Sequence, residues 1–414
     1  MLIRSSRGTS FADANATVLT LGFAYASDHG YRLAATADGY ALTDLTTGEQ
    51  FAFDETDLAL DSLSLDFSDA TAAVELHGGA NGDLLRGGSG DDVLVGGGGA
   101  DQLFGGAGDD TLSVSHNYAT VEGGEGVDTL MIDAGVVLTL RSDAASGIER
   151  VFVGDGGEAL FQNLGVSMGS IYVRSVAGGA VTTVSGTAAN DWIVGGAGQD
   201  RLFGNNGDDT IVIKSVPRQI IGGEGDDRLV LKGGGTFVLG DAQLSEIEGI
   251  KVTGGSTLDI SNVHFQPGWL TGSGSDSLKI TGSGYNDRIT GADGDDVLTG
   301  GYGGDRISGG AGADTFVFRQ HYDIGGPGAR DQITDFSHAE GDKISLEGAA
   351  RYIGGAFQFI GDDAFSGSGA NELRAVERNG RTLVMGDIND DGKADFLFYV
   401  KTEDGPLVAG DFIL

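Results

Sequence analysis

The sequence contains no cysteine and only four prolines in 414 residues, and its 61 aspartates and glutamates far outnumber its 25 lysines and arginines. Without cysteine the chain forms no disulfides, and with so little proline it is neither collagen-like nor a stiff linker. A net charge of −36 repels nucleic acid phosphates. No apolar run reaches the roughly 18 residues of a membrane span, so none is predicted.

The residues in excess are glycine, with 75 copies, and aspartate, which supplies 46 of the 61 acidic residues. Aspartate together with glycine is typical of tight turns and of oxygen ligands for hard cations such as Ca²⁺. A hydrophobic fraction of 40% is enough for a packed core once the charge is neutralised. The composition therefore favours an ordered, turn-rich protein that binds cations.

Glycine and aspartate recur with a period of nine residues. Three blocks of consecutive nonamers run from Gly78 to Ser113, from Gly186 to Val212 and from Gly282 to Val317, and single copies start at Gly123 and Gly222. The sixth position of each nonamer is aspartate and the eighth is a large apolar residue, as in GGSGDDVLV. A fixed short period of this kind predicts a solenoid.

A second period of 99 residues (222 − 123) relates GGEGVDTL at Gly123 to GGEGDDRL at Gly222, and SGIERVFV to SEIEGIKV at the same spacing. Because 99 is eleven times nine, the nonamer frame is kept between these copies. The intervening nonamers VSHNYATVE and IKSVPRQII keep an apolar eighth residue, Val121 and Ile220, but lose the glycines and the aspartate. We therefore predict that the solenoid continues there without a cation site.

The residue types of the nonamer suit calcium. Its Gly-Gly-x-Gly-x stretch turns tightly, reaches positive φ and exposes backbone carbonyls, and the aspartate adds a carboxylate where the turn ends. Ca²⁺ takes about six to eight such oxygens, and the x-apolar-x triplet that follows is a minimal strand with one inward side chain. Two alternatives stay open. One is a calcium-free solenoid, although buried unpaired aspartate rows are costly. The other is a flexible acidic linker, although a linker has no reason to space aliphatic residues so regularly.

These nonamers resemble the GGxGxDxUx repeats of the RTX (repeats-in-toxin) family over Gly78–Met131, Gly186–Val230 and Gly282–Val317. The resemblance implies an all-β protein built on a calcium-loaded parallel β-roll, or β-solenoid, whose position-six aspartates and turn carbonyls bind several Ca²⁺ ions. The ligands it implies are Asp83, Gly88, Gly90, Asp92, Gly97, Gly99, Asp101, Gly106, Gly108, Asp110, Gly124, Gly126, Asp128, Asp191, Gly196, Gly198, Asp200, Gly207, Asp209, Gly223, Gly225, Asp227, Asp287, Gly294, Asp296, Gly301, Gly303, Asp305, Gly310, Gly312 and Asp314.

The pattern is imperfect at the start of each block. Glycine positions are taken by Asn81, Thr187, Ala189, Asn205, Ser283, Tyr285 and Ala292, which predicts weaker calcium sites in the first half-turns. The copy TGSGSDSLK around Asp276 lies out of frame and is marginal.

The segment after Val317 resembles the C-terminal domain of serralysin-type secreted metalloproteases, in which DTFVF, D-x-I-x-DF and GDKI follow in this order and cap the roll. The resemblance runs from about Gly282 to the end of the chain. It implies that Asp411, Phe412, Ile413 and Leu414 form an uncleaved type I secretion signal for an ABC exporter. The same four residues also read as a closing edge strand, and both interpretations can hold together.

DINDDGKAD places Asp387, Asn389, Asp391 and Asp395 around a turn glycine and resembles the front half of an EF-hand loop. Its twelfth position is Phe398 rather than a bidentate glutamate, so it is not an EF-hand. We predict a single calcium loop on a hairpin, and the alternative is a plain Asp-Gly turn.

No catalytic residue is predicted. HExxH is absent, and none of the six histidines pairs at i, i+4. GVSMG (Gly165–Gly169) fits G-x-S-x-G, but it lies in a glycine-rich β repeat rather than in the strand–turn–helix of a nucleophile elbow, so Ser167 is discounted.

The sequence thus predicts an N-terminal β cap or head over 1–77, a calcium-binding β-roll over 78–281, and a third RTX block with a capping and secretion domain over 282–414. The apolar run Val18–Ala26 is interpreted as a buried strand rather than as a cleaved signal peptide. We expect export by the type I route to the cell exterior or cell surface, and folding there on weak extracellular calcium sites.

Three roles are compatible with these features. The first is a structural role in a surface layer, matrix or adhesive contact, through calcium-dependent self-association or calcium bridges to anionic surface glycans. The second is a binding module for a carbohydrate, ice or a host partner. The third is a hydrolase whose site is not recognisable.

Overall fold

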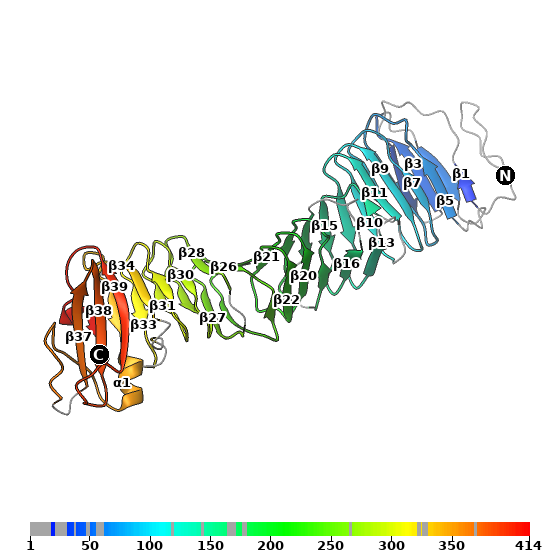
Figure 1. Ribbon diagram of the computed structural model, residues 1–414. Helices are drawn as coiled ribbons and strands as arrows, with labels where there is room; N and C mark the ends of the chain where they lie inside the picture. The colour runs from blue at the N-terminus through cyan, green and yellow to red at the C-terminus, as the bar shows by residue number, and fades with distance from the viewer. Residues whose placement is uncertain are drawn as a thin grey trace. The chain divides into compact units, whose positions relative to one another are not determined.

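The computed structural model describes residues 18–20, 31–36, 39–46, 50–54, 62–116, 120–141, 145–163, 171–175, 180–264, 267–320, 324, 330–367 and 371–414. Its contacts divide the chain into two compact units, residues 1–210 with 223–225 and residues 211–222 with 226–414. Both units consist almost wholly of short strands (Figure 1), which confirms the predicted all-β fold. Within these residues, no helix combines the length and the apolar character needed to cross a membrane.

Parallel strands stack in three sheets in the first unit (Figure 1). One sheet contains β1 (Val18–Thr20), β5 (Ser62–Asp66), β7 (Leu84–Arg86), β9 (Gln102–Ala107), β11 (Thr120–Glu125) and β14 (Ala145–Ser146). A second contains β6 (Val74–His77), β8 (Val93–Val95), β10 (Thr111–Val114), β12 (Thr129–Ile132), β15 (Arg150–Val153), β17 (Tyr172–Ser175) and β19 (Trp192–Val194). A third contains β13 (Val137–Arg141), β16 (Glu158–Asn163), β18 (Thr183–Ser185) and β20 (Arg201–Asn206).

The register in the first block advances by 18 residues per coil. Leu103 pairs with Val121 in one sheet. In the next sheet, Leu112 pairs with Leu94 on one side and with Leu130 on the other. One coil is therefore two nonamers, each of which contributes one turn and one strand. These five side chains are fully buried, because the central residue of each x-apolar-x strand points into the same thin core.

The nonamers that lost their glycines keep the frame. Val121 lies on β11 in register with Leu103 and is fully buried. Ile220 is likewise buried, on β22 (Gln219–Glu224), which pairs with β25 (Leu244–Ser245). These contacts confirm that the solenoid continues through both nonamers. β21 (Thr210–Ile213) follows the second block.

Ahead of the first nonamer, β5 and β6 already stack in parallel register on β7 and β8. The antiparallel strands β2 (Tyr31–Thr36), β3 (Gly39–Asp44) and β4 (Gln50–Asp54) come before them, and β2 pairs with β6. An antiparallel hairpin at the end of a parallel stack covers an edge that would otherwise be open.

The second unit repeats the stacked arrangement with two long parallel ladders (Figure 1). One ladder runs through β23 (Arg228–Leu231), β26 (Gly249–Thr253), β28 (Trp269–Ser273), β30 (Arg288–Thr290), β32 (Arg306–Ser308), β34 (Gln332–Phe336) and β39 (Phe396–Thr402). The other runs through β24 (Thr236–Gly240), β27 (Thr257–Asn262), β29 (Lys279–Thr281), β31 (Val297–Thr299), β33 (Thr315–Val317), β35 (Lys343–Ser345) and β40 (Phe412–Ile413).

The second unit ends in an antiparallel meander of β37 (Glu372–Arg378), β38 (Arg381–Asp387) and β39, with β36 (Gln358–Phe359) beside β37. The helix α1 (Glu347–Ile353) follows β35, and the 3-10 turn η3 (Ala409–Asp411) precedes β40. β40 pairs with β35, which confirms the prediction of a closing edge strand.

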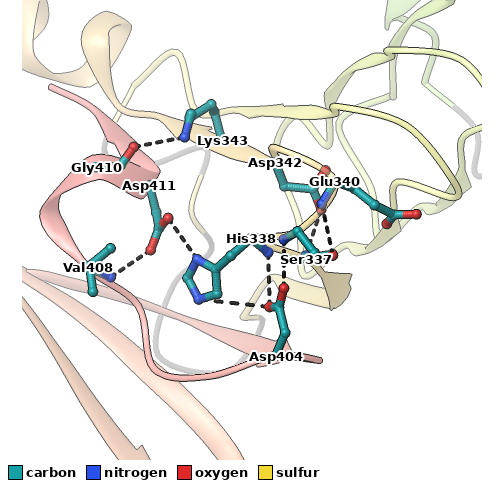
Figure 2. Close-up of polar contacts among 10 residues, drawn as sticks. Ser337, His338, Glu340, Asp342, Lys343, Asp404, Val408, Gly410 and Asp411 are labelled. Atoms are coloured by element: carbon teal, nitrogen blue, oxygen red, sulfur yellow. Dashed lines mark hydrogen bonds and ion pairs between the residues drawn. The ribbon is translucent and has the colours of Figure 1, made fainter.

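The chain end is also held by side chains (Figure 2). Nδ1 of His338 lies 2.9 Å from Oδ1 of Asp411, and Asp404 accepts the backbone N–H groups of His338 and Ala339. Partial burial lowers the pKa of His338, but the two aspartates outweigh it and raise that pKa above its usual value. Lys343 donates a hydrogen bond to the carbonyl of Gly410.

Candidate calcium sites

The position-six aspartates form hydrogen-bonded ladders along the turns. Oδ1 of Asp101 accepts the backbone N–H of Asp83 at 3.0 Å, and Oδ1 of Asp110 accepts that of Asp92 at 2.7 Å. The same bond joins Asp128 to Asp110, Asp209 to Asp191, Asp305 to Asp287 and Asp314 to Asp296. All these side chains are at most 3% exposed. Each rung therefore sets a buried carboxylate between two stacked turns.

The first coil with two position-six aspartates in each block has one kind of turn. There, Oδ2 of the aspartate accepts the N–H of the second residue of its own turn, as Asp92 does from Gly88 and Asp296 from Ala292, both at 2.6 Å. We call these self-capped turns; their aspartates are Asp83, Asp92, Asp191, Asp200, Asp287 and Asp296.

The later coils have a second kind of turn, in which the second and fourth residues have left-handed φ, for example 121° at Gly106 and 115° at Gly108. A Cβ on Gly106 would fall on the carbonyl oxygen of Gly88 in the coil before, so the earlier carbonyls point at the later turn. We call these open turns; they start at Gly96, Gly105, Gly123, Gly204, Gly222, Gly300 and Gly309.

The non-glycine residues follow this division. Asn81, Thr187, Ala189, Ser283, Tyr285 and Ala292 all belong to self-capped turns, and none of them has left-handed φ. Asn205 alone lies in an open turn, with φ of 83°, a conformation that asparagine tolerates better than most residues. The substitutions thus mark a whole first coil whose backbone does not require glycine.

Burial raises the pKa of the ladder carboxyls, against the lowering effect of the backbone N–H groups that they accept. The pKa reaches about 6 for Asp92, Asp101, Asp128, Asp191 and Asp287, and about 7 for Asp110 and Asp314. The charges of Asp92 and Asp128 add to the shift at Asp110. Rows of buried like charges are costly without a counter-ion.

The donor set fits calcium. Oδ2 of Asp110, Asp128 and Asp314 is buried and has no hydrogen-bond donor among the described residues. Beside each stands a turn whose carbonyls face the next coil, and all these donors are hard oxygens of the kind Ca²⁺ prefers. No three acidic or histidine side chains converge on one point in the described part of the chain. Such sites would therefore take many ligands from the backbone.

The predicted residues come together in pairs of stacked turns. Within the two units these pairs start at Gly78 and Gly96, Gly87 and Gly105, Gly105 and Gly123, Gly186 and Gly204, Gly282 and Gly300, and Gly291 and Gly309. Asp200 instead accepts the N–H of Thr182. Asp276 is exposed, as expected for a copy that lies out of frame.

Four ladder residues escaped the sequence analysis. Oε2 of Glu149 accepts the N–H of Asp128 at 2.8 Å, and Oε2 of Glu248 accepts that of Asp227 at 2.7 Å. Oδ1 of Asp331 and Oδ1 of Asp342 continue the ladders from Asp305 and Asp314. In the sequence, Glu149 and Glu248 are marked by the 99-residue repeat of SGIER as SEIEG, and Asp342 by the GDKI motif. The nonamer period does not predict these residues, because the coils that contain them are longer than 18 residues.

The EF-hand-like loop connects β38 to β39, and its carboxylates bind the loop backbone. Asp387 is 1% exposed and accepts N–H groups from Asp390 and Gly392. Asp395 accepts from Ile388 and from the side chain of Asn389, and Asp391 accepts from Lys393. These bonds shape a tight loop and leave its metal binding a prediction.

The candidate nucleophile Ser167 lies outside the described residues. Two of the described histidines pair locally with acidic side chains, His77 with Glu75 and His264 with Asp241.

A parallel β-solenoid whose turns carry rows of buried carboxylates and exposed carbonyls is the architecture of a calcium-binding β-roll. The RTX calcium-binding nonapeptide repeat, in four copies, matches this chain at residues 77–112, 177–212 and 281–316. These three segments are therefore RTX calcium-binding repeats in a β-roll, and they bind multiple Ca²⁺ ions. No curated protein matches the chain.

The second match begins one nonamer before Gly186, at AGGAVTTVS. The sixth residue of this nonamer is Thr182 in place of aspartate, and its eighth, Val184, is fully buried. The second block thus holds four nonamers rather than the three recognised from glycine and aspartate alone.

Proposed function

We propose that the protein is secreted, folds on calcium outside the cell, and serves a structural role in a surface layer, matrix or adhesive contact through calcium-dependent self-assembly. The observation that carries this proposal is the row of buried aspartates with raised pKa values, such as Asp110 and Asp314. Without a cation, this row and the net charge of −36 oppose the compact state. The chain would then stay open inside the cell, where free calcium is scarce.

Extracellular-type sites bind calcium with Kd of about 10⁻⁴–10⁻³ M. A site held at ten times its Kd adds about 1.4 kcal/mol to the free energy of unfolding, so six such sites add roughly 8 kcal/mol. That is the whole stability of an ordinary domain. Calcium at extracellular levels is therefore sufficient to decide whether these coils fold.

We also propose that the terminal residues are read by a type I exporter before folding. In the folded unit β40 is paired with β35, and Asp411 accepts the N–H of Val408 and contacts His338. An exporter could engage this segment only while the chain is open. Deleting residues 411–414 should retain the protein inside the producing cells, and undiminished export of the deletion variant would contradict this proposal.

Circular dichroism with excess chelator and with millimolar calcium tests the folding proposal. We expect a disordered spectrum that becomes a β spectrum on adding calcium, and no such change with magnesium. The same β signal in chelator would overturn calcium-coupled folding. Sedimentation and negative-stain electron microscopy test the role separately, because monomers in calcium would contradict self-assembly and leave the folding step intact.

The alternative is a binding module for a carbohydrate or a host surface, and one observation favours it: an outer sheet face of the second unit carries cations and an aromatic side chain in line, described below. Monomers that bind a glycan without turning it over would favour this alternative.

We further propose one calcium ion in the loop of Asp387, Asn389, Asp391 and Asp395. Loss of a single bound ion in Asp391→Ala, with the rolls still folding, would support it.

A further inference from the structure

The outer face of one sheet in the second unit carries cations in line. Arg228 on β23 pairs in register with Gly249 on β26, and Gly249 pairs with Trp269 on β28. The next residues of β28 and β30 are register partners, which sets Trp269 beside Arg288. Arg288 pairs in turn with Arg306 on β32. We call Arg228, Trp269, Arg288 and Arg306 the arginine row.

The arginine row faces solvent. On each of these strands, the residue directly after the row member (or after Gly249 on β26) points into the core. These residues are at most 1% exposed: Leu229, Ile250, Leu270, Ile289 and Ile307. Alternation along a strand therefore turns the row outward. Arg228, Arg288 and Arg306 are exposed, and none of them forms an ion pair with a described residue. Unpaired arginines stand out in a chain with 61 acidic residues.

The column next to the row carries no acidic residue, although its last member, Ser308, donates a hydrogen bond to Asp335 on β34. The second column on this face, two residues further along the same strands, consists in register of Val230, which is buried, and of Lys251, Thr271, Thr290 and Ser308, which are half-buried. Arg288 and Arg306 stand directly opposite on strands about 4.8 Å apart, and like charges in this position repel each other. An anion across both guanidinium groups would relieve that repulsion.

Trp269 lies flat on the sheet because its neighbour is glycine. A Cβ on Gly249 would overlap the indole ring, so the ring occupies the space above that residue. The guanidinium of Arg228 lies 5.1 Å from the ring centroid. The row thus places one flat apolar surface, Trp269, between Arg228 on one side and Arg288 and Arg306 on the other.

We propose that the arginine row binds an anionic polysaccharide lying across the strands. Successive strands present one side chain about every 4.8 Å, close to the length of one pyranose unit in an extended glycan. Guanidinium groups suit the carboxylates or sulfates of such a chain, the indole suits a sugar ring, and Lys251 and the hydroxyls of the second column suit sugar hydroxyls. A nucleic acid duplex is wider and would bring phosphates against the acidic turns at the strand ends.

This proposal rests on the extracellular location proposed above but not on self-assembly or on calcium bridges. Binding of the calcium-loaded full chain to immobilised chondroitin sulfate is measured by biolayer interferometry, with neutral dextran as the uncharged control. We expect Arg288→Gln/Arg306→Gln to weaken binding at least about tenfold, because charge-assisted hydrogen bonds at two sites are lost. The matched control is Arg201→Gln/Arg218→Gln, which removes the same charge from residues that are not part of the row and should change affinity less than about twofold.

Each outcome is decisive. Absence of wild-type binding to chondroitin sulfate, equal binding to dextran, or equal losses in the two double variants would overturn the proposal. Equal affinity for duplex DNA would show that the surface attracts any polyanion and would also overturn it. Calcium-induced circular dichroism of each variant separates lost binding from lost folding, and normal folding without glycan binding leaves the calcium proposal untouched.

Discussion

Self-capped and open turns use the same residues in different conformations. GGSGDD at Gly87–Asp92 and GGAGDD at Gly105–Asp110 have glycine at the same positions, yet Gly88 avoids the left-handed region and Gly106 adopts it. What differs is the coil before. The second sequence stacks on the RTX turn that starts at Gly87, whereas the first stacks on residues 70–73, which are not part of an RTX nonamer. The unit that could hold a calcium ion is therefore a pair of turns, and the first coil of a block serves as the base on which the next one is built.

The largest effect expected from this difference is at Asp110, whose open turn stacks on the self-capped turn of Asp92 on one side and on the open turn of Asp128 on the other. Asp110→Asn keeps an acceptor for the N–H of Asp92 but removes the charge from a buried oxygen without a donor. We expect the calcium concentration at the folding midpoint to rise about tenfold or more, because two stacked pairs share this ligand and tenfold corresponds to about 1.4 kcal/mol.

The matched control is Asp83→Asn, in a self-capped turn whose aspartate bonds to Leu63 and Gly79. Its midpoint should move less, because only one stacked RTX turn borders it. Calcium titrations followed by circular dichroism compare the two. Equal shifts would show that the position in the block does not matter.

The second comparison exchanges glycine and alanine at equivalent positions one coil apart, Ala292 and Gly310. Gly310→Ala places a side chain at φ of 101° and against the carbonyl of Ala292. The left-handed conformation alone costs about 1–2 kcal/mol, and the contact adds to it. Ala292→Gly should cost less than about 1 kcal/mol. Denaturant unfolding in calcium measures both, and a larger loss for Ala292→Gly would contradict the assignment of the two turn types.

Much of this could be read from the sequence, because the core is periodic. One buried residue per nonamer predicts Val121 in register with Leu103 even where the glycines are gone. The conformation of the turns could not be read, because Gly88 and Gly106 are the same residue and only the neighbouring coil separates them. The arginine row was missed for a related reason. Its members are unequally spaced along the chain, and register across coils of different length cannot be counted from a nonamer frame.

The two kinds of turn share one pH dependence, because burial raises the pKa of the carboxyls in both. The folded-state pKa is about 7 for Asp110 and Asp314 and about 6 for Asp101 and Asp128, all in open turns, and about 6 for Asp92 and Asp287 in self-capped turns. All six values lie above the unfolded value of about 3.9, so between pH 4 and 7 the folded state without calcium binds more protons than the unfolded state. Stability in chelator should therefore rise as the pH falls from about 7 to about 4.

Calcium reverses this trend because protons compete for the same oxygens, so the calcium midpoint should increase as the pH falls. Circular dichroism at a series of pH values, with and without chelator, checks both signs. A calcium-free chain that becomes less folded on acidification between pH 7 and 5 would contradict the burial of these carboxyls.

The smallest effect is expected at Asn205, the one non-glycine residue with left-handed φ in the described open turns. Asn205→Gly relieves a left-handed φ of 83° but loses the hydrogen bonds from its amide to Ser185 and to the carbonyl of Gly186. The two contributions are each about 1 kcal/mol and opposite in sign, so the free energy of unfolding in calcium should change by less than about 1 kcal/mol. Asn205→Ala loses the same bonds without relieving the backbone and should be the less stable variant. If the alanine variant matched the glycine variant in denaturant unfolding, left-handed φ would not be the property that separates open from self-capped turns.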